Sequence, residues 1–259
     1  MTTTLVQISD LHFGALNEVT LAPLQKHIAD LQPDLLVVSG DLTQRARPKQ
    51  FDEAAAYIAS LYDCSCLVVP GNHDVPLWNI WRRFVDPHRH FNRHFGSENY
   101  SRHVSDSLAV LGIDTTRSLT ISNGRINQQQ MDEIAGFFAH YNNKWKIVVA
   151  HHPFVLPEDV DGESVVGRAT TALASFLEEK IDLLLTGHRH VSWNNMLEST
   201  TLTVHAGTAT SSRTRSECNA FNELRFDENS VVIRTYHWQA KYNEFQLSNE
   251  SNWQRHQLG

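Results

Sequence analysis

The sequence predicts an α/β layered domain, and two observations lead to this prediction. In the first two-thirds of the chain, strand-like apolar runs alternate with helix-like segments, which is typical of layered α/β domains. Beyond His190 only strand-like segments follow, separated by short turns. The chain has 259 residues, of which 41% are hydrophobic and 20% are charged, so it is long enough to bury a large core. We predict one domain over residues 1–259.

Short apolar runs in the first two-thirds of the chain predict strands. The runs at 35–39 and 181–185 are almost entirely apolar, as expected of strands that are buried on both faces. The predicted strands are Leu5–Ser9, Leu35–Ser39, Cys66–Val69, Ser107–Ile113, Lys146–Ala150 and Ile181–Leu185.

Helical segments lie between these runs. Residues 48–61 start with a proline and have an alanine-rich centre, which favours a helix that begins at Pro48. The predicted helices are Leu21–Leu31, Pro48–Leu61, Leu77–Val85, Gln128–Phe138 and Thr171–Glu179.

The last third of the chain reads as consecutive strands. No helical stretch separates them, which implies a second sheet that is antiparallel. These predicted strands are Trp193–Leu197, Thr201–Val204, Phe221–Phe226, Val231–Trp238 and Tyr242–Leu247.

Five strand-like runs end in residue types that bind metals. Five such strand ends in one chain are not expected by chance, so we interpret them as one site at the edge of a sheet. The site would hold two metal ions. The fragments are Asp10-Leu11-His12, Gly40-Asp41, Gly71-Asn72-His73-Asp74, His151-His152 and Gly187-His188-Arg189-His190.

The candidate ligands offer nitrogen and oxygen, which borderline divalent metals accept. Two metals about 3.5–4 Å apart need a shared ligand, and a carboxylate can bridge whereas a neutral imidazole cannot. Asp41 is the natural bridge because it stands alone on its strand end. In Asp10-x-His12 and His188-x-His190, an extended backbone would point both side chains to one face. The candidates are Asp10, His12, Asp41, Asn72, His151, His188 and His190.

The ordered motifs Asp-x-His, Gly-Asp, Gly-Asn-His-Asp, His-His-Pro and Gly-His-x-His resemble the calcineurin-like metallophosphoesterases. The chain is most similar to their bacterial branch of cyclic-nucleotide and glycerophosphodiester phosphodiesterases. The resemblance runs from Asp10 to His190, about seven-tenths of the chain, and no ligand position is missing. A lone Gly-Asn-His-Asp would be weak support, whereas five motifs in order are specific.

The resemblance implies a four-layer α/β/β/α sandwich of two mixed sheets with flanking helices. It also implies that His73 is the catalytic acid rather than a ligand. The implied ligand sets are Asp10, His12, Asp41 and His190 for one metal, and Asp41, Asn72, His151 and His188 for the other.

The expected function is hydrolysis of a phosphodiester, with a 3',5'-cyclic nucleotide such as cAMP as the leading substrate. Two divalent metals (manganese, iron, zinc or cobalt) would neutralise the phosphate oxygens and lower the pKa of a bridging water towards about 7, so that hydroxide attacks. Alternatives are a glycerophosphodiester, a phosphomonoester or the pyrophosphate of a nucleotide-linked lipid. A non-catalytic scaffold is a distant alternative, because scaffolds lose ligands.

Residues 75–103 follow the Gly-Asn-His-Asp loop and are rich in aromatic and basic side chains. We predict that they form a cap that shapes the substrate pocket, with Trp81 and Phe91 in its wall, because long excursions in compact domains often carry function. The alternative is a surface excursion whose aromatic rings pack on the core.

For several residues near the motifs, the sequence is compatible with more than one role. Asp74 could orient the ring of His73 or cap the following helix. His152 would point away from the site on an extended backbone, so it has no assigned role. Arginines suit phosphate recognition, but exposed surface arginines are the commoner explanation. The arginines concerned are Arg45, Arg47, Arg213 and Arg215.

We expect the partner to be a small-molecule phosphate ester, because composition disfavours a nucleic acid or a membrane. The net charge of −7 disfavours nucleic acid. No apolar stretch approaches the roughly 20 residues that span a bilayer, and no targeting signal is visible, so we predict no membrane partner. Three reduced cysteines are expected of a cytoplasmic protein. The sequence leaves open whether the protein forms a homo-oligomer.

Overall fold

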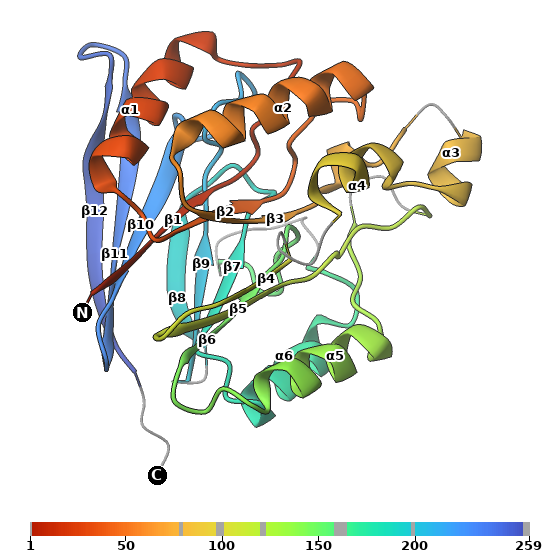
Figure 1. The fold of residues 1–259 in the computed structure, drawn as a ribbon, viewed down its shortest axis with the longest axis vertical. Helices are drawn as coiled ribbons and strands as arrows, with labels where there is room; N and C mark the ends of the chain where they lie inside the picture. The colour runs from red at the N-terminus through yellow and green to blue at the C-terminus, as the bar shows by residue number, and fades with distance from the viewer. Residues whose placement is uncertain are drawn as a thin grey trace.

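Two six-stranded sheets pack face to face, with helices on both outer faces (Figure 1). This four-layer α/β/β/α arrangement of mixed sheets confirms the predicted fold class. The computed structural model describes residues 2–77, 80–96, 101–119, 123–157, 165–197 and 200–255.

The first sheet has the strand order β12-β11-β10-β1-β2-β3. Strands β1, β2 and β3 run parallel, and β10 joins the other side of β1 in the antiparallel direction. The bounds are β1 (Thr3–Ile8), β2 (Leu35–Ser39), β3 (Ser65–Val69), β10 (Ala220–Phe226), β11 (Ser230–Gln239) and β12 (Glu244–Gln254).

The second sheet has the strand order β4-β5-β6-β7-β9-β8. Strands β5, β6, β7 and β9 run parallel, and the two edge strands β4 and β8 are antiparallel to their neighbours. The bounds are β4 (Arg102–Val104), β5 (Leu108–Gly112), β6 (Trp145–Val149), β7 (Leu183–Thr186), β8 (Trp193–Leu197) and β9 (Thr201–His205).

The expectation that the last third forms an antiparallel sheet of its own is wrong. Strands β8 and β9 extend the sheet that contains β7, whereas β10, β11 and β12 extend the sheet that contains β1. The physical reason is that β1 and β7 would otherwise end their sheets with unpaired backbone groups. The short turns show that strands follow one another, but they do not show which sheet each strand joins.

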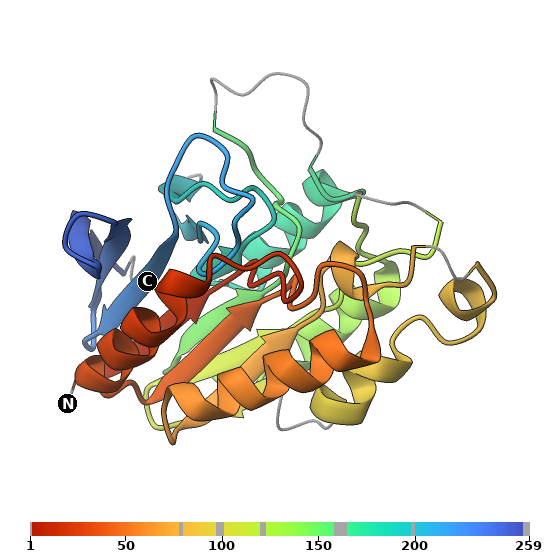
Figure 2. The same ribbon diagram turned by 90° about the horizontal axis from the view of Figure 1, so that it is seen from above.

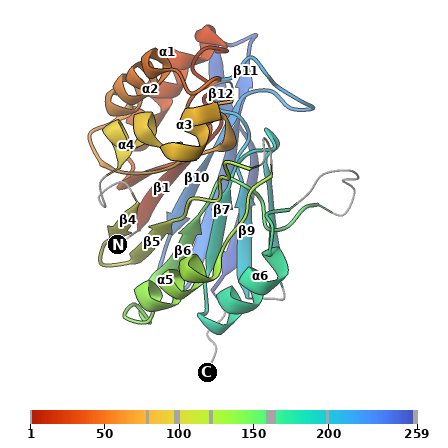
Figure 3. The ribbon, with the colours of Figure 1, turned by 90° about the vertical axis from the view of Figure 1, so that its right-hand side faces the viewer.

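The layers are held by apolar clusters on the two faces of each sheet. Helices α1 (Leu21–Leu31) and α2 (Pro48–Leu61) cover the first sheet, and α5 (Gln128–Phe138) and α6 (Ala169–Glu178) cover the second (Figure 3). Alternate residues of β2 point to opposite faces, so one set meets the second sheet and the other meets α1 and α2.

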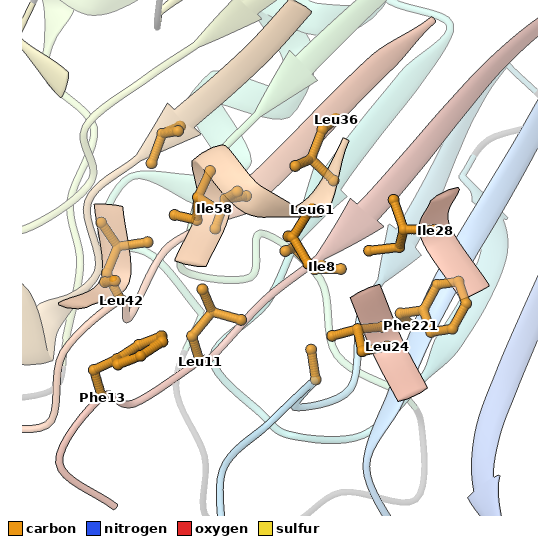
Figure 4. Close-up of a cluster of buried hydrophobic side chains, with 14 of the residues drawn as sticks. Ile8, Leu11, Phe13, Leu24, Ile28, Leu36, Leu42, Ile58, Leu61 and Phe221 are labelled. Carbon is orange, nitrogen blue, oxygen red and sulfur yellow. The ribbon is translucent and has the colours of Figure 1, made fainter. Parts of the chain in front are cut away.

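Figure 4 shows the cluster under α1 and α2. Ile28 of α1 and Ile58 of α2 pack against Ile8 and Leu36 of the sheet, and these four side chains are at most 4% exposed. Burying one such side chain stabilises the fold by about 1.5–3 kcal/mol. This rigid packing fixes the positions at which β1 and β2 end.

The parallel strands of both sheets end at one edge of the sandwich, and the loops that follow them gather there. The loop after β1 lies beside the segment between β9 and β10 (Figure 2). Backbone hydrogen bonds join the two: Asn17 N donates to Thr210 O at 2.7 Å, and Ala209 N donates to Ser9 O at 2.9 Å. Loops at the carboxyl ends of parallel strands are the usual place for a binding site in α/β proteins.

Two short helices, α3 (Ile80–Val85) and α4 (Arg89–Phe95), follow the Gly-Asn-His-Asp loop. Phe91 and Phe95 of α4 are 6% and 5% exposed in the cluster under α2, whereas Trp81 of α3 is 76% exposed. The cap over residues 75–103 stays a prediction, and residues 78–79 and 97–100 of it lie outside the described part. No helix among the described residues is long and apolar enough to cross a membrane.

Candidate metal centre

The loops after β1, β2, β3, β6 and β7 meet at the edge described above. His188 donates its backbone N–H to Asp10 Oδ2 at 2.9 Å, which joins the two sheets. His73 donates its backbone N–H to Asp41 Oδ1 at 2.8 Å. The ring of His151 lies 5.0 Å from that of His188, centre to centre. All five fragments that the sequence singled out therefore lie together.

Two glycines allow the loops to approach so closely. Gly40 has φ +94°, and a Cβ atom there would stand 2.5 Å from His151 Nδ1. A Cβ atom on Gly71 would overlap Asp41 Oδ1. A larger residue at either position would displace a ligand side chain, which explains the glycine before each motif.

Five of the seven candidate ligands adopt left-handed backbone conformations. The prediction that the pairs Asp10-x-His12 and His188-x-His190 converge on an extended backbone is therefore wrong, because all four of these residues turn the chain sharply. Such a conformation costs a non-glycine residue about 1–2 kcal/mol, so neighbouring contacts must hold it. Thr208 Oγ1 donates to Asp10 O at 2.7 Å and Thr210 Oγ1 donates to Leu11 O at 2.9 Å. The φ angles are 54°, 52°, 53°, 75° and 59° for Asp10, His12, Asp41, His188 and His190.

One cluster of side chains contains Asp10, His12 and His190, with Asp41 at its border. His190 Nε2 lies 3.2 Å from Asp10 Oδ1 and 3.0 Å from His12 Nε2. His12 Nε2 lies 3.6 Å from Asp41 Oδ2. All four residues are buried, and they are the four that the resemblance assigns to one metal.

A second cluster surrounds His151. Its Nε2 lies 3.4 Å from Asp41 Oδ2, 3.2 Å from Asn72 Oδ1 and 3.1 Å from His188 Nδ1. The Oδ2 atom of Asp41 thus faces both clusters, at 3.4 Å from His151 and 3.6 Å from His12. A carboxylate that bridges two metals needs this position.

The hydrogen bonds around the clusters leave lone pairs that face one another. His151 donates its Nδ1–H to Ser39 O at 2.8 Å, and His190 donates its Nδ1–H to Arg213 O at 2.6 Å. The Nε2 atom of each ring therefore presents a lone pair to the cluster. Asp10 Oδ1 is buried and accepts no hydrogen bond among the described residues. Converging nitrogen and oxygen lone pairs repel one another unless a cation lies between them, so the residues fit divalent metals.

Burial and charge shift the pKa values of these groups in opposite directions. Burial raises the pKa of Asp10, but the charge of His190, the hydrogen bonds of His12 and His190 and the charge of His151 together outweigh burial and hold that pKa well below its usual range. Burial lowers the pKa of His151, but the charge and hydrogen bond of Asp41, the charge of Asp10 and the hydrogen bond to Ser39 together outweigh burial and raise that pKa to about 9. Burial and the charge of His151 lower the pKa of His188 to about 4. The carboxylates stay ionised and attract a positive charge, which is either a proton or a metal.

A comparison with protein families agrees with this geometry. The family model described as calcineurin-like phosphoesterase matches residues 3–192. The chain belongs to the calcineurin-like phosphoesterase family. It is therefore a metal-dependent phosphoesterase. Within the described residues, the groups that could hold a metal contain the histidines and aspartates of the two clusters and also His73 and His152.

This chain is similar in sequence to a probable phosphodiesterase and to a pyrophosphatase, and similar in fold to a phosphatase. A probable cyclic nucleotide phosphodiesterase of Ruthia magnifica subsp. Calyptogena magnifica is 23% identical over 199 residues, which cover 73% of this chain and 79% of that protein. A UDP-2,3-diacylglucosamine pyrophosphatase of Chlamydia trachomatis is 35% identical over 72 residues, 27% of this chain and 22% of that protein. A dimetal phosphatase from Danio rerio has the same fold, with a TM-score of 0.71 at 13% identity over 96% of this chain and 98% of that one.

Two further histidines of this phosphoesterase flank the clusters. The ring of His152 lies 4.8 Å from that of His188, centre to centre, and His152 Nδ1 lies 2.8 Å from Thr115 Oγ1. Sequence reasoning missed this position because it assumed an extended backbone. His73 Nδ1 donates to Gln44 O at 3.0 Å, which leaves its Nε2 on the open side of the site.

Asp74 has neither of the two roles considered from the sequence. Its carboxylate accepts hydrogen bonds from the backbone N–H groups of Gly71, Leu42 and Thr43 at 3.0, 3.0 and 2.9 Å. It therefore fastens the loop after β2 to the loop after β3, and the carbonyl of Gln44 orients His73 instead. Burial and the charge of Asp41 raise the pKa of Asp74 to about 6.

Arg213 also contacts the site, although no feature of its sequence neighbourhood singled it out from Arg45, Arg47 and Arg215. Its carbonyl oxygen accepts from His190, as described above. Its guanidinium Nη1 lies 3.3 Å from His73 Nε2 and 3.3 Å from Gln44 Oε1. The only signal in the sequence is that Arg213 follows a run of small residues, Gly207–Ser212.

Proposed function

We propose that this protein is a dinuclear metal-dependent phosphodiesterase whose best substrate is a 3',5'-cyclic nucleotide such as cAMP. The observation that carries the proposal is the position of Asp41 Oδ2, 3.4 Å from His151 and 3.6 Å from His12. The naming of a relative with 23% identity as a probable cyclic nucleotide phosphodiesterase supports the substrate.

We assign the side chains to roles as follows. The two metal ions, when bound, supply positive charge for the phosphate oxygens and an activated water molecule. Asp41 is the shared ligand of both ions. Asp10, His12 and His190 complete one ligand set, and Asn72, His151 and His188 complete the other.

His73 serves as the acid for the leaving oxygen in this proposal. The carbonyl of Gln44 accepts the Nδ1–H of His73 at 3.0 Å, so the ring presents Nε2 to the open side. The ring of His73 lies 4.9 Å from that of the proposed ligand His12, centre to centre, and this closeness supports a role for His73 in the reaction. The acid is the imidazolium form of His73, which carries a proton on Nε2 as well as on Nδ1. A leaving alkoxide that takes the Nε2 proton departs as a neutral alcohol and leaves the ring neutral.

A second candidate is hydrolysis of the pyrophosphate of a nucleotide-linked lipid. The 72-residue match to the UDP-2,3-diacylglucosamine pyrophosphatase, at 35% identity, favours it. The same ligand set would serve a glycerophosphodiester or a phosphomonoester. A non-catalytic scaffold is the distant alternative, because every ligand position is filled in this chain.

The proposal is tested by hydrolysis of a substrate panel with manganese, iron, zinc and cobalt added in turn. The panel contains cAMP, glycerophosphocholine, p-nitrophenyl phosphate and a UDP-linked lipid. We expect the largest kcat/KM for cAMP. Asp41→Asn serves as the inactive control, and His140→Ala, on the exposed surface beyond α5, serves as the matched active control. A larger kcat/KM for the UDP-linked lipid would favour the second candidate, and bound metal without any turnover would favour the scaffold.

A further inference from the structure

The segment 207–213 is fastened to the β1 end of the metal site by hydrogen bonds along its length. Besides the threonine contacts described above, Ser212 N donates to Ala15 O at 2.8 Å, and Arg213 N donates to Ser211 Oγ at 3.0 Å. The backbone of Arg213 is therefore held in place, although its side chain is exposed. A fixed backbone with an exposed guanidinium at the open side of the site suits capture of a ligand.

Arg213 touches both functional parts of the site. Its carbonyl oxygen fixes the ring of the ligand His190, and its guanidinium lies against the proposed acid His73 and against Gln44. The two side-chain contacts are both 3.3 Å long and both use Nη1. Charge-assisted bonds are typically about 2.7–2.9 Å long, so these contacts are weak. The Nε and Nη2 atoms of Arg213 have no recorded hydrogen bond within the described part of the chain.

We propose that Arg213 binds a non-bridging oxygen of the substrate phosphate and releases His73 as it does so. This inference rests on the proposed phosphoester substrate. In the structure His73 donates through Nδ1 to Gln44, so its Nε2 accepts from Arg213. That nitrogen cannot serve the leaving oxygen while the guanidinium occupies it. An anionic phosphate offers the guanidinium a stronger, two-pronged partner and thereby frees Nε2.

The structure distinguishes Arg213 from the arginines that follow the Asp41 loop. Arg45 and Arg47 are exposed, and no hydrogen bond or ion pair from their guanidinium groups to the metal-site loops is recorded among the described residues. Arg213, by contrast, reaches a residue 140 positions away in the chain. Such a contact requires the folded site and is not a property of a solvated surface arginine.

Binding of inorganic phosphate to the zinc-loaded protein, measured by calorimetry, tests the inference. A hydrogen bond to a charged group is worth about 1.5–3 kcal/mol, so we expect Arg213→Gln to weaken phosphate binding by about 10- to 100-fold. Arg213→Lys should recover part of the loss because it keeps the charge. Lys26→Gln removes an exposed positive charge of α1, outside the site and the predicted cap, and should bind phosphate as the unaltered protein does. Unchanged phosphate binding in Arg213→Gln would overturn the inference.

A second measurement separates ligand binding from a merely structural role. In the unaltered protein, phosphate should shift the ¹⁵N resonance of His73 Nε2, because the guanidinium leaves that atom. In Arg213→Gln the resonance should already be shifted and phosphate should add little. The carbonyl contact to His190 remains in the variant, so its zinc content should not fall. A loss of zinc, or an unshifted His73, would show that Arg213 only supports the loop.

These tests are independent of the substrate. A protein that binds phosphate through Arg213 but cleaves no diester would keep this inference and refute the proposed function. If the Arg213→Gln variant cleaves cAMP and binds phosphate as well as the unaltered protein does, the proposed function stands and this inference is refuted.

Discussion

His151 donates its Nδ1–H to the backbone carbonyl of Ser39 at 2.8 Å, and this bond crosses from the second sheet to the first. It leaves the other ring nitrogen facing Asp41. The orientation of the ligand is therefore set by the packing of two sheets rather than by its own loop. A displacement of either sheet would be felt directly at the metal centre.

Loss of Asp41 should disturb both metals together, because its Oδ2 atom faces both clusters. We expect Asp41→Ala to abolish activity and to lower bound metal more than any other single ligand substitution. Elemental analysis of the purified variants gives the measurement. Asp52→Asn, an exposed aspartate of α2, is the control. Full metal occupancy in Asp41→Ala would refute its role as the bridge.

His73→Ala should reduce turnover without reducing metal content, because Asn72 still supplies the neighbouring ligand. General acid catalysis contributes about 10²–10⁴-fold, so a loss of that size is expected for a ribose leaving group. The loss should be much smaller for a nitrophenyl leaving group, which departs without a proton. Equal losses on both kinds of ester would identify His73 as a structural residue.

Phe91 and Trp81 should respond differently to truncation. Phe91 is 6% exposed in the apolar cluster under α2, so Phe91→Ala should lower the free energy of unfolding by about 3–5 kcal/mol. Trp81 is 76% exposed, so Trp81→Ala should change the free energy of unfolding by less than about 0.5 kcal/mol. Urea titration measures both.

If residues 75–103 form the predicted cap, Trp81→Ala should also alter the preference between bulky and small diesters at constant metal content. An unchanged ratio of kcat/KM values would speak against the cap at this position.

His205 should make stability depend on pH. Burial, with a smaller effect of the charge of Arg189, lowers its pKa to about 3 in the folded state, against about 6.5 when unfolded. Below pH 6.5 the unfolded chain takes up a proton that the folded chain does not, so the free energy of unfolding falls as pH falls. Between pH 7 and pH 5 the contribution is about 2 kcal/mol.

Urea titrations of His205→Gln and of the unaltered protein at both pH values isolate this contribution, because all other histidines are common to the two. The variant should lose less stability on acidification. Parallel losses would mean that His205 is protonated in the folded protein.

The sequence predicted the ends of the helices and the residues of the site better than it predicted which strands pair with each other. Helices α2 and α5 begin and end where the sequence placed them, at 48–61 and 128–138. Their ends depend on neighbouring residues, such as Pro48 at the start of α2 and Asn127, whose side chain accepts from Gln130 N. The seven candidate ligands also lie together, because residue type and strand end are both local features.

Features that depend on distant contacts were not predictable in the same way. The sheet that each late strand joins is decided by free edges of β1 and β7, far away in the chain. The left-handed backbone at Asp10 and Leu11 accepts hydrogen bonds from Thr208 and Thr210, which are 198 and 199 residues away in the chain. The carboxylate of Asp74 accepts from Thr43, which is 31 residues away. Arg213 is a further case, because its partner Gln44 is 169 residues away.

The left-handed conformations of the ligand residues tie metal affinity to the stability of the whole molecule. Each of these backbones is held by contacts from another part of the fold, so no single loop can present its ligands alone. Metal that binds only the folded chain stabilises it by RT ln(1 + [M]/Kd). Chelation and heat should therefore act on one equilibrium: a chelator should lower the melting temperature, and unfolding of these loops should release the bound metal.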